Sequence, residues 1–74
     1  MKLYILSRID QNYHYDENLG FVIRAKDSEA ARHLASKASA DEGPDTWLNS
    51  QNSVCEELTN KGEEGIILSD FLAG

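Results

Sequence analysis

Cationic side chains are scarce in this sequence. Seven Lys and Arg residues stand against 13 Asp and Glu residues, which gives a formal net charge of -6 at pH 7. Proteins that bind nucleic acid directly contact its phosphates through clustered Lys and Arg, so we expect no direct nucleic-acid binding. Two interpretations of the acidity stay open. It keeps a small protein soluble, or it meets a basic surface on a protein partner.

Cysteine and histidine are rarer still. Cys55 is the only cysteine, which excludes a disulfide within the chain and suits a reducing compartment. His14 and His33 are the only histidines, so the ligand set for a zinc site is poor. The sequence has no nucleophile–base pair, no glycine-rich phosphate loop and no paired-histidine motif. We therefore expect no enzymatic activity, no metal and no cofactor.

Long apolar segments are absent as well. A membrane-spanning helix needs about 20 predominantly apolar residues, and nothing in the sequence approaches that length. The first apolar stretch stops at Ser7-Arg8, too early for a signal peptide, so we expect a cytoplasmic protein. Residues 1–74 fit a single small domain with a thin core, which dimerisation would help to stabilise.

The hydrophobic pattern predicts the order β-β-α-β-β. Apolar residues with a strand-like period of two occur in four segments, 2–8, 20–26, 53–59 and 65–71. The first segment is apolar on both faces, which is typical of a central strand. The predicted fold class is α+β, a four-stranded, mainly antiparallel sheet with one helix packed on one face. The predicted core consists of Leu3, Ile5, Phe21, Ile23, Leu34, Val54, Leu58, Ile66 and Leu68.

One helix is predicted between the second and third strands. Asp27-Ser28 offers a capping side chain at its start, and Gly43-Pro44 follows its end. The apolar stripe at helical spacing is mostly alanine, so we expect the helix to lie close to the sheet. The stripe consists of Ala30, Ala31, Leu34, Ala35 and Ala38, and we expect Glu29, Arg32 and Ser36 to face away.

The most unusual segment is Tyr13-His14-Tyr15-Asp16-Glu17, in the predicted loop between the first two strands. Tyrosines on exposed loops make good interface anchors because each offers a rigid surface and a hydroxyl group. Loops also carry a large share of binding residues. We interpret the segment as a protein-binding loop. The alternative is that one of the tyrosines folds back to cover the small core.

Acidic residues form a second candidate surface near the predicted last hairpin. Glu57 lies on the third predicted strand, and Glu63 and Glu64 lie in the turn that follows. Spaced carboxylates can imitate a nucleic-acid backbone and occupy Lys and Arg groups on a protein that handles DNA or RNA. The alternative is that these side chains are simply solvated. Asp41, Glu42 and Asp45 form a further acidic group after the helix.

Trp47 is the only tryptophan and lies between the predicted helix and the third strand. We expect it to cover an open end of the core. An exposed interface position is the alternative, because tryptophan is enriched at binding hot spots. Cys55 stands beside Glu56 and Glu57, which would raise its pKa, so we expect an unreactive thiol.

Several short motifs resemble those of a known group of proteins. They are the opening Met1-Lys2-Leu3-Tyr4, Tyr15-Asp16 before the second strand, Asp27-Ser28-Glu29-Ala30-Ala31-Arg32, Trp47, and the closing stretch from Gly65 to Gly74. The chain resembles short proteins of bacterial genomes and their phages, to which no activity is assigned. The resemblance implies a mobile-element context. Small acidic phage proteins often resemble host-defence inhibitors such as anti-CRISPR proteins.

Two functional hypotheses follow. In the first, the chain is a non-enzymatic, phage-encoded nucleic-acid mimic that binds and inhibits a basic, nucleic-acid-handling host protein. In the second, it is a small assembly module that forms a homodimer through a sheet edge or the open sheet face. The predicted protein-binding residues are Tyr13, His14, Tyr15, Asp16, Glu17, Glu57, Glu63 and Glu64.

Overall fold

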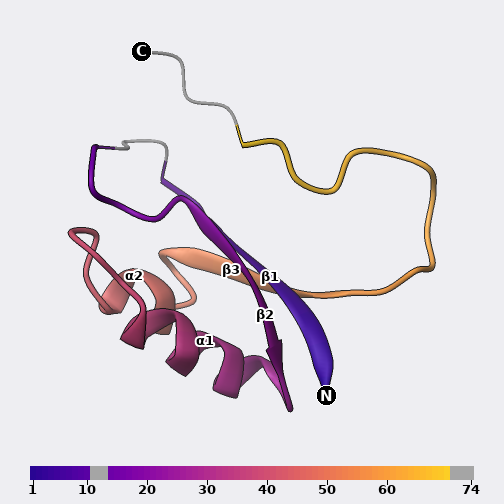
Figure 1. Cartoon of the computed structure of the whole chain (residues 1–74), viewed down its shortest axis with the longest axis horizontal. Coiled ribbons are helices and arrows are strands. Elements are labelled where there is room, and N and C mark those ends of the chain that lie inside the picture. Colours follow the sequence, from indigo (N-terminus) through magenta and orange to yellow (C-terminus); the bar gives the residue numbers. More distant parts are fainter. Residues whose placement is uncertain (11–13, 71–74) are drawn as a thin grey trace.

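The computed structural model describes residues 1–10 and 14–70. In chain order the elements are β1 (Lys2–Arg8), β2 (Gly20–Ala25), α1 (Ser28–Lys37), α2 (Asp45–Leu48) and β3 (Ser53–Leu58). The strands form one antiparallel sheet in the order β2-β1-β3, and α1 lies across one of its faces (Figure 1). The structure confirms a small α+β fold with an antiparallel sheet and one main helix.

β1 is the central strand, as its apolar pattern predicts. Leu6 pairs with Phe21 of β2 on one side and with Cys55 of β3 on the other. Side chains alternate between the two faces of a sheet, and Tyr4 and Leu6 belong to the core that α1 covers. Ile5 therefore points to the opposite face, where it is nevertheless only 9% exposed.

α1 begins where the sequence predicts, because Asp27 caps it. The Ala30 backbone N–H donates a 2.8 Å hydrogen bond to Oδ1 of Asp27, which satisfies one of the free N–H groups of the first turn. Ala31 and Ala35 are fully buried. Their small side chains let the helix lie close to the sheet.

The residues on either side of the buried stripe of α1 differ from the prediction. Successive helical residues are about 100° apart, so Leu34 and Arg32 flank the Ala31–Ala35 stripe on opposite sides. The side of Leu34 faces water, and this predicted core residue is 47% exposed. The side of Arg32 faces α2 and the start of β3, so the expectation that Arg32 faces away is wrong.

Arg32 joins α1 to the two elements that follow it. Its Nη1 donates to the Trp47 backbone oxygen at 2.8 Å and to Ser53 Oγ at 2.9 Å, and its Nη2 donates to the Ser53 backbone oxygen at 3.0 Å. Ser53 is fully buried. Buried polar groups of this kind require partners, and Arg32 supplies them.

Trp47 covers the core, as expected. It lies on α2, a short helix between α1 and β3, and it is fully buried. Its ring meets Phe21 edge-on, with 4.9 Å between the ring centroids and an interplanar angle of 78°. The buried cluster comprises Tyr4, Leu6, Ala25, Ala31, Ala35 and Trp47, with Phe21, Ile23, Ala30 and Cys55 packed against it.

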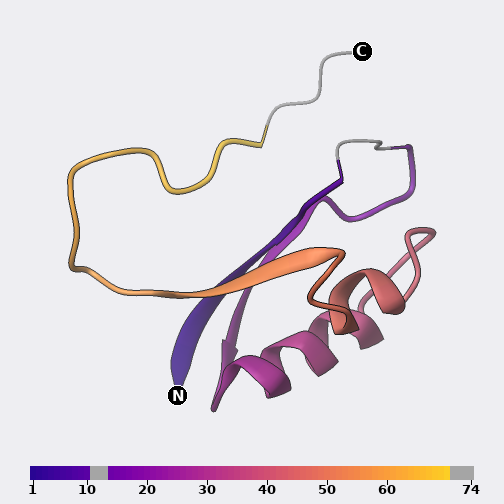
Figure 2. The same cartoon turned by 180° about the vertical axis from the view of Figure 1, so that it is seen from behind.

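The predicted fourth strand, residues 65–71, is not confirmed. Residues 65–70 form no strand, and Phe71 lies outside the described residues. Ile66 and Leu68, predicted as core, are 86% and 57% exposed. A hairpin here would bring the acidic pairs 56–57 and 63–64 together, and like charges on neighbouring strands destabilise pairing. Residues 59–70 instead swing away from β3 and return toward the β1–β2 loop (Figures 1 and 2).

The sheet face opposite α1 carries a second apolar surface, called here the open face. By the strand register it consists of Leu3, Ile5, Ser7, Gly20, Val22, Arg24, Val54, Glu56 and Leu58. Leu3 and Val54, predicted as core, are 39% and 40% exposed on this face, and Val22 is 52% exposed. No helix of the described residues covers it (Figure 2).

Candidate functional site

Arg8, at the end of β1, fixes the loop that leads to β2. Its guanidinium donates to both carboxylate oxygens of Asp10, at 2.9 and 3.0 Å, and to Oε1 of Glu17 at 2.9 Å. The His14 backbone N–H donates to the same Glu17 oxygen at 3.1 Å. The Arg8 side chain is 5% exposed and that of Glu17 is 12% exposed. Such charge-assisted bonds are the stronger class of hydrogen bond, so Glu17 is committed to holding the loop.

Glu42, in the connection between α1 and α2, accepts four hydrogen bonds. Its Oε2 accepts from Trp47 Nε1 at 2.7 Å and from Asn18 Nδ2 at 3.0 Å. Its Oε1 accepts from the backbone N–H groups of Asn18 and Ala40, both at 3.0 Å. Glu42 therefore ties the β1–β2 loop to the α1–α2 connection and to the buried tryptophan.

These contacts bring two acidic segments together at one end of the molecule. The Asp41 backbone N–H donates to the Asp16 backbone oxygen at 2.9 Å, and Asn18 Nδ2 also donates to the Ala38 backbone oxygen at 3.2 Å. Both views show the loop and the connection at the same end (Figures 1 and 2). We call the exposed part of this end the acidic end. It consists of Asp10, His14, Tyr15, Asp16, Asp41 and Asp45.

The acidic end has a strongly one-sided charge. Segments 8–19 and 38–49 contain six carboxylates and a single cation, Arg8. The Arg8 guanidinium, followed by the His14 backbone N–H, holds the pKa of Glu17 below its usual value. Burial alone would raise the pKa of Glu42, but the hydrogen bonds from Trp47 and Asn18 outweigh it and lower the pKa to about 2. Both side chains are ionised at neutral pH.

Exposed groups suited to a partner remain beside these buried anchors. Tyr15 is 85% exposed, so it does not cover the core as the alternative interpretation proposed for one of the tyrosines. Asp16 has a positive φ of 62°, a conformation that aspartate tolerates better than most residues. Asp16 and Asp41 are exposed and form no ion pair within residues 1–10 and 14–70.

The structure does not bring all the predicted binding residues together. His14, Tyr15 and Asp16 are exposed at the acidic end, and Tyr13 lies outside the described residues. Glu57 instead pairs with Lys2 at 3.5 Å, at the far end of β1 from Arg8. Glu63 and Glu64 are exposed on the segment after β3.

Asp41 belongs to the acidic end, although it is absent from the predicted binding residues. The acidic group that it forms with Glu42 and Asp45 is visible in the sequence. The contact of Asp41 with Asp16 is not, because 25 residues separate the two.

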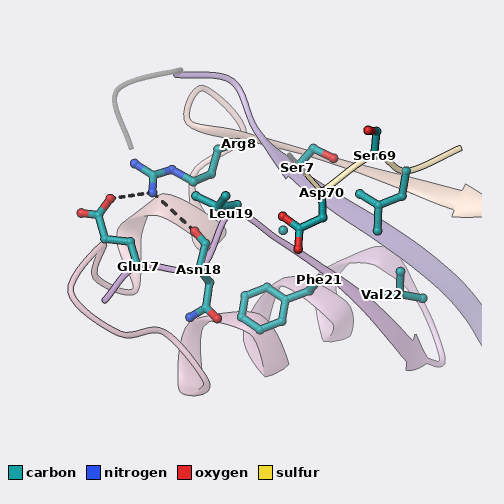
Figure 3. Close-up of a pocket in the computed structure, with 11 residues that line it drawn as sticks. Ser7, Arg8, Glu17, Asn18, Leu19, Phe21, Val22, Ser69 and Asp70 are labelled. Atoms are coloured by element: carbon teal, nitrogen blue, oxygen red, sulfur yellow. Dashed lines mark hydrogen bonds and ion pairs between the residues drawn. The ribbon is translucent and has the colours of Figure 1, made fainter. Parts of the chain in front are cut away.

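A hollow of about 540 Å³ lies between the end of the sheet and the returning C-terminal segment. Ser7, Gly20 and Val22 line it from the strands, and Leu68, Ser69 and Asp70 line it from the segment (Figure 3). The paired Arg8 and Glu17 side chains also line it, at the end nearest the loop. The lining is mixed and has no converging nucleophile, base and donor set.

The remaining reactive side chains form no site in the described part of the chain. Burial raises the pKa of the Cys55 thiol, with the nearby Arg32 charge opposing it, which favours the less reactive protonated form. Within residues 1–10 and 14–70, no group of three or more His, Cys, Asp or Glu side chains could hold a metal ion. In the same residues, no helix has the length and apolar character needed to cross a bilayer.

Comparison with known proteins found no match for the chain. No family model, no curated protein and no solved structure matches the chain.

Proposed function

We propose that the chain is a non-enzymatic interaction protein that binds a basic surface of a protein partner through its acidic end. The observation that carries this proposal is the anchoring of the β1–β2 loop against the α1–α2 connection by Glu42 and Asn18. The anchor holds the 85% exposed Tyr15 beside the exposed Asp16 and Asp41. A preorganised surface loses less conformational entropy on binding.

Chemistry favours a basic partner. Unpaired carboxylates at the rim of an interface speed association with a positive surface and disfavour an acidic one. An exposed tyrosine next to them supplies the desolvated contact area that slows dissociation. Protein surfaces that hold nucleic acid are dense in Lys and Arg. We therefore propose a nucleic-acid-handling protein as the partner class and competition with nucleic acid as the effect.

The test uses two variants of equal net charge. Asp16→Asn with Asp41→Asn removes two charges from the acidic end, and asparagine tolerates the positive φ of position 16. Glu29→Gln with Glu56→Gln removes two exposed charges elsewhere. The tagged chain is used to capture partners from a cell lysate at low and high salt. We expect a salt-sensitive partner that the first variant loses and the control keeps, and that DNA or RNA displaces.

Two results would contradict the proposal. Equal loss of the partner with both variants would mean that only the overall charge matters. Capture that is unaffected by salt and by Asp16→Asn with Asp41→Asn would place the contact surface elsewhere on the molecule.

A further inference from the structure

Two apolar surfaces are partly exposed among residues 1–10 and 14–70. The first is the open face, on which Leu3, Val22 and Val54 are 39%, 52% and 40% exposed. The second is the segment that we call the tail, residues 63–70, in which Ile66, Ile67 and Leu68 are 86%, 67% and 57% exposed. Three consecutive large apolar residues in water are unfavourable, since each gains about 1.5–3 kcal/mol when fully buried.

The charges of the two surfaces are complementary at the β2 edge of the open face. Arg24 is an exposed cation on the open face and has no ion pair within residues 1–10 and 14–70. The tail carries the carboxylates of Glu63 and Glu64 immediately before its apolar residues. The open face therefore has Arg24 at its β2 edge and the exposed Glu56 on β3, and the negative end of the tail is complementary to the β2 edge.

We propose that the tail of one copy of the chain binds the open face of a second copy, and that the exchange is reciprocal. Because both surfaces belong to every copy, a two-fold arrangement satisfies them all at once. A three-strand face of this length covers roughly 280 Å². Each tail–face contact buries about this area on the face and again on the tail. Two such contacts therefore bury about 1,100 Å² in total, just above the limit of about 1,000 Å² for a specific interface.

The chain's own tail does not fill this role. Residues 59–67 swing away from the sheet, and only the end of the tail returns to it (Figures 1 and 2). Leu68, Ser69 and Asp70 reach Ser7 and Val22, with the hollow of about 540 Å³ between them (Figure 3). Docking within one chain thus leaves Ile66 and Ile67 in water, whereas a second copy's tail can lie flat along the face.

The direction of the bound tail follows from the same contacts. The end of the chain's own tail lies at the Ser7–Gly20 end of the sheet. With this direction, the start of an incoming tail lies toward the row of Leu3 and Arg24 at the other end. Extended residues advance about 3.3 Å each. When Ile66 to Leu68 cover Val22, Glu63 and Glu64 are within reach of the Arg24 guanidinium.

Mixing two charge-reversed variants tests the exchange. In Arg24→Glu, both contacts of a homodimer place glutamate against glutamate. In Glu63→Lys with Glu64→Lys, both contacts place lysine against arginine. We expect each variant alone to dimerise at least tenfold more weakly than the natural chain in sedimentation velocity. A mixture of the two variants pairs opposite charges at both contacts, so we expect it to recover the dimer.

Further variants separate the exchange from general effects. Lys37→Glu reverses an exposed cation on α1, remote from the open face, and should dimerise normally. Ile66→Asp should abolish the dimer without loss of folding by circular dichroism, because Ile66 is 86% exposed in the single chain. Leu48→Asp changes a residue of α2 that is 43% exposed and should dimerise normally.

Three results would overturn the proposal. The first is a natural chain that stays monomeric at protein concentrations up to about 1 mM. A dissociation constant of that size is the weakest that such an interface would show. The second is a dimer that survives Ile66→Asp. The third is a mixture of the charge-reversed variants that remains as monomeric as its components, because that outcome excludes contact between tail and face of different copies.

Discussion

Replacing Glu42 is expected to destabilise the fold more than replacing any other carboxylate. In Glu42→Gln the amide nitrogen takes the place of one carboxylate oxygen. Trp47 Nε1 and Asn18 Nδ2 donate to one oxygen, and the Asn18 and Ala40 backbone N–H groups donate to the other. Either orientation of the amide therefore leaves two donors facing another donor.

Two arguments give the loss of unfolding free energy in Glu42→Gln. Hydrogen bonds to a charged group contribute about 1.5–3 kcal/mol each, so losing two and weakening two should cost at least about 3 kcal/mol. The pKa of Glu42 is about 2 in the folded chain against a usual 4.5, and this difference sets an upper limit of about 3 kcal/mol, which screening by solvent reduces. A chain of 74 residues is stable by about 4–11 kcal/mol, so the loss is a large fraction of the total.

The sign of the pH dependence distinguishes this explanation from a simple packing defect. The folded-state pKa of Glu42 is depressed, so its contribution is fully present above pH 4.5 and disappears as the pH falls toward 2. The difference in unfolding free energy between the natural chain and Glu42→Gln should therefore be largest at pH 7 and shrink below pH 4. Urea titrations at pH 7 and pH 3, followed by Trp47 fluorescence and circular dichroism, measure it.

The neighbouring carboxylate provides the control. Asp41 is exposed and its side chain makes no hydrogen bond within the described residues, so Asp41→Asn should change the unfolding free energy by less than about 0.5 kcal/mol. Equal urea midpoints for Glu42→Gln and Asp41→Asn at pH 7 would refute the reasoning. A Glu42→Gln deficit of the same size at pH 7 and pH 3 would refute the electrostatic part of it.

Three further outcomes are expected. Arg32→Ala should cost about 2–4 kcal/mol in urea unfolding, because Ser53 is fully buried and loses its partner; a loss below 0.5 kcal/mol would contradict this. Leu34→Ala should cost no more than about 1 kcal/mol, since the residue is 47% exposed, and unfolding at room temperature would show that it is core. Tyr15→Ala should leave the melting temperature within about 2 °C but speed dissociation from a captured partner, as surface plasmon resonance would show; an unchanged dissociation rate would remove Tyr15 from the interface.

Local signals in the sequence predicted three strands and α1, but not α2, and the fourth predicted strand is not confirmed. The both-faced apolar pattern of residues 2–8 predicted a central strand with the observed bounds, and Asp27 predicted the start of α1. These features depend on neighbours within a few positions. Which residues beside the buried stripe of α1 are packed and which are exposed depends instead on the other elements that lie next to α1. Leu34 and Arg32 were therefore assigned to the wrong sides.

The candidate site was predicted only in part, because its geometry depends on distant contacts. The loop segment with Tyr15 and the acidic group after the helix were both visible as motifs. Nothing local shows that Asn18 donates to Glu42, 24 positions away. The prediction that Glu57 lies near Glu63 and Glu64 depended on a hairpin that the structure does not confirm. Ile66 to Leu68 have a strand-like pattern, but propensity alone does not supply a neighbouring strand.

The sheet order β2-β1-β3 has a consequence for the folding reaction. β1 pairs with β2 across the loop of residues 9–19, but its second edge pairs with β3, which begins at Ser53. The hairpin of β1 and β2 can form early, although an isolated two-stranded hairpin is only marginally stable. Closing the sheet requires contacts about 50 residues apart, and such non-local pairings slow folding. Until β3 arrives, the free edge of β1 is open to pairing with other chains, so aggregation during refolding should increase steeply with protein concentration.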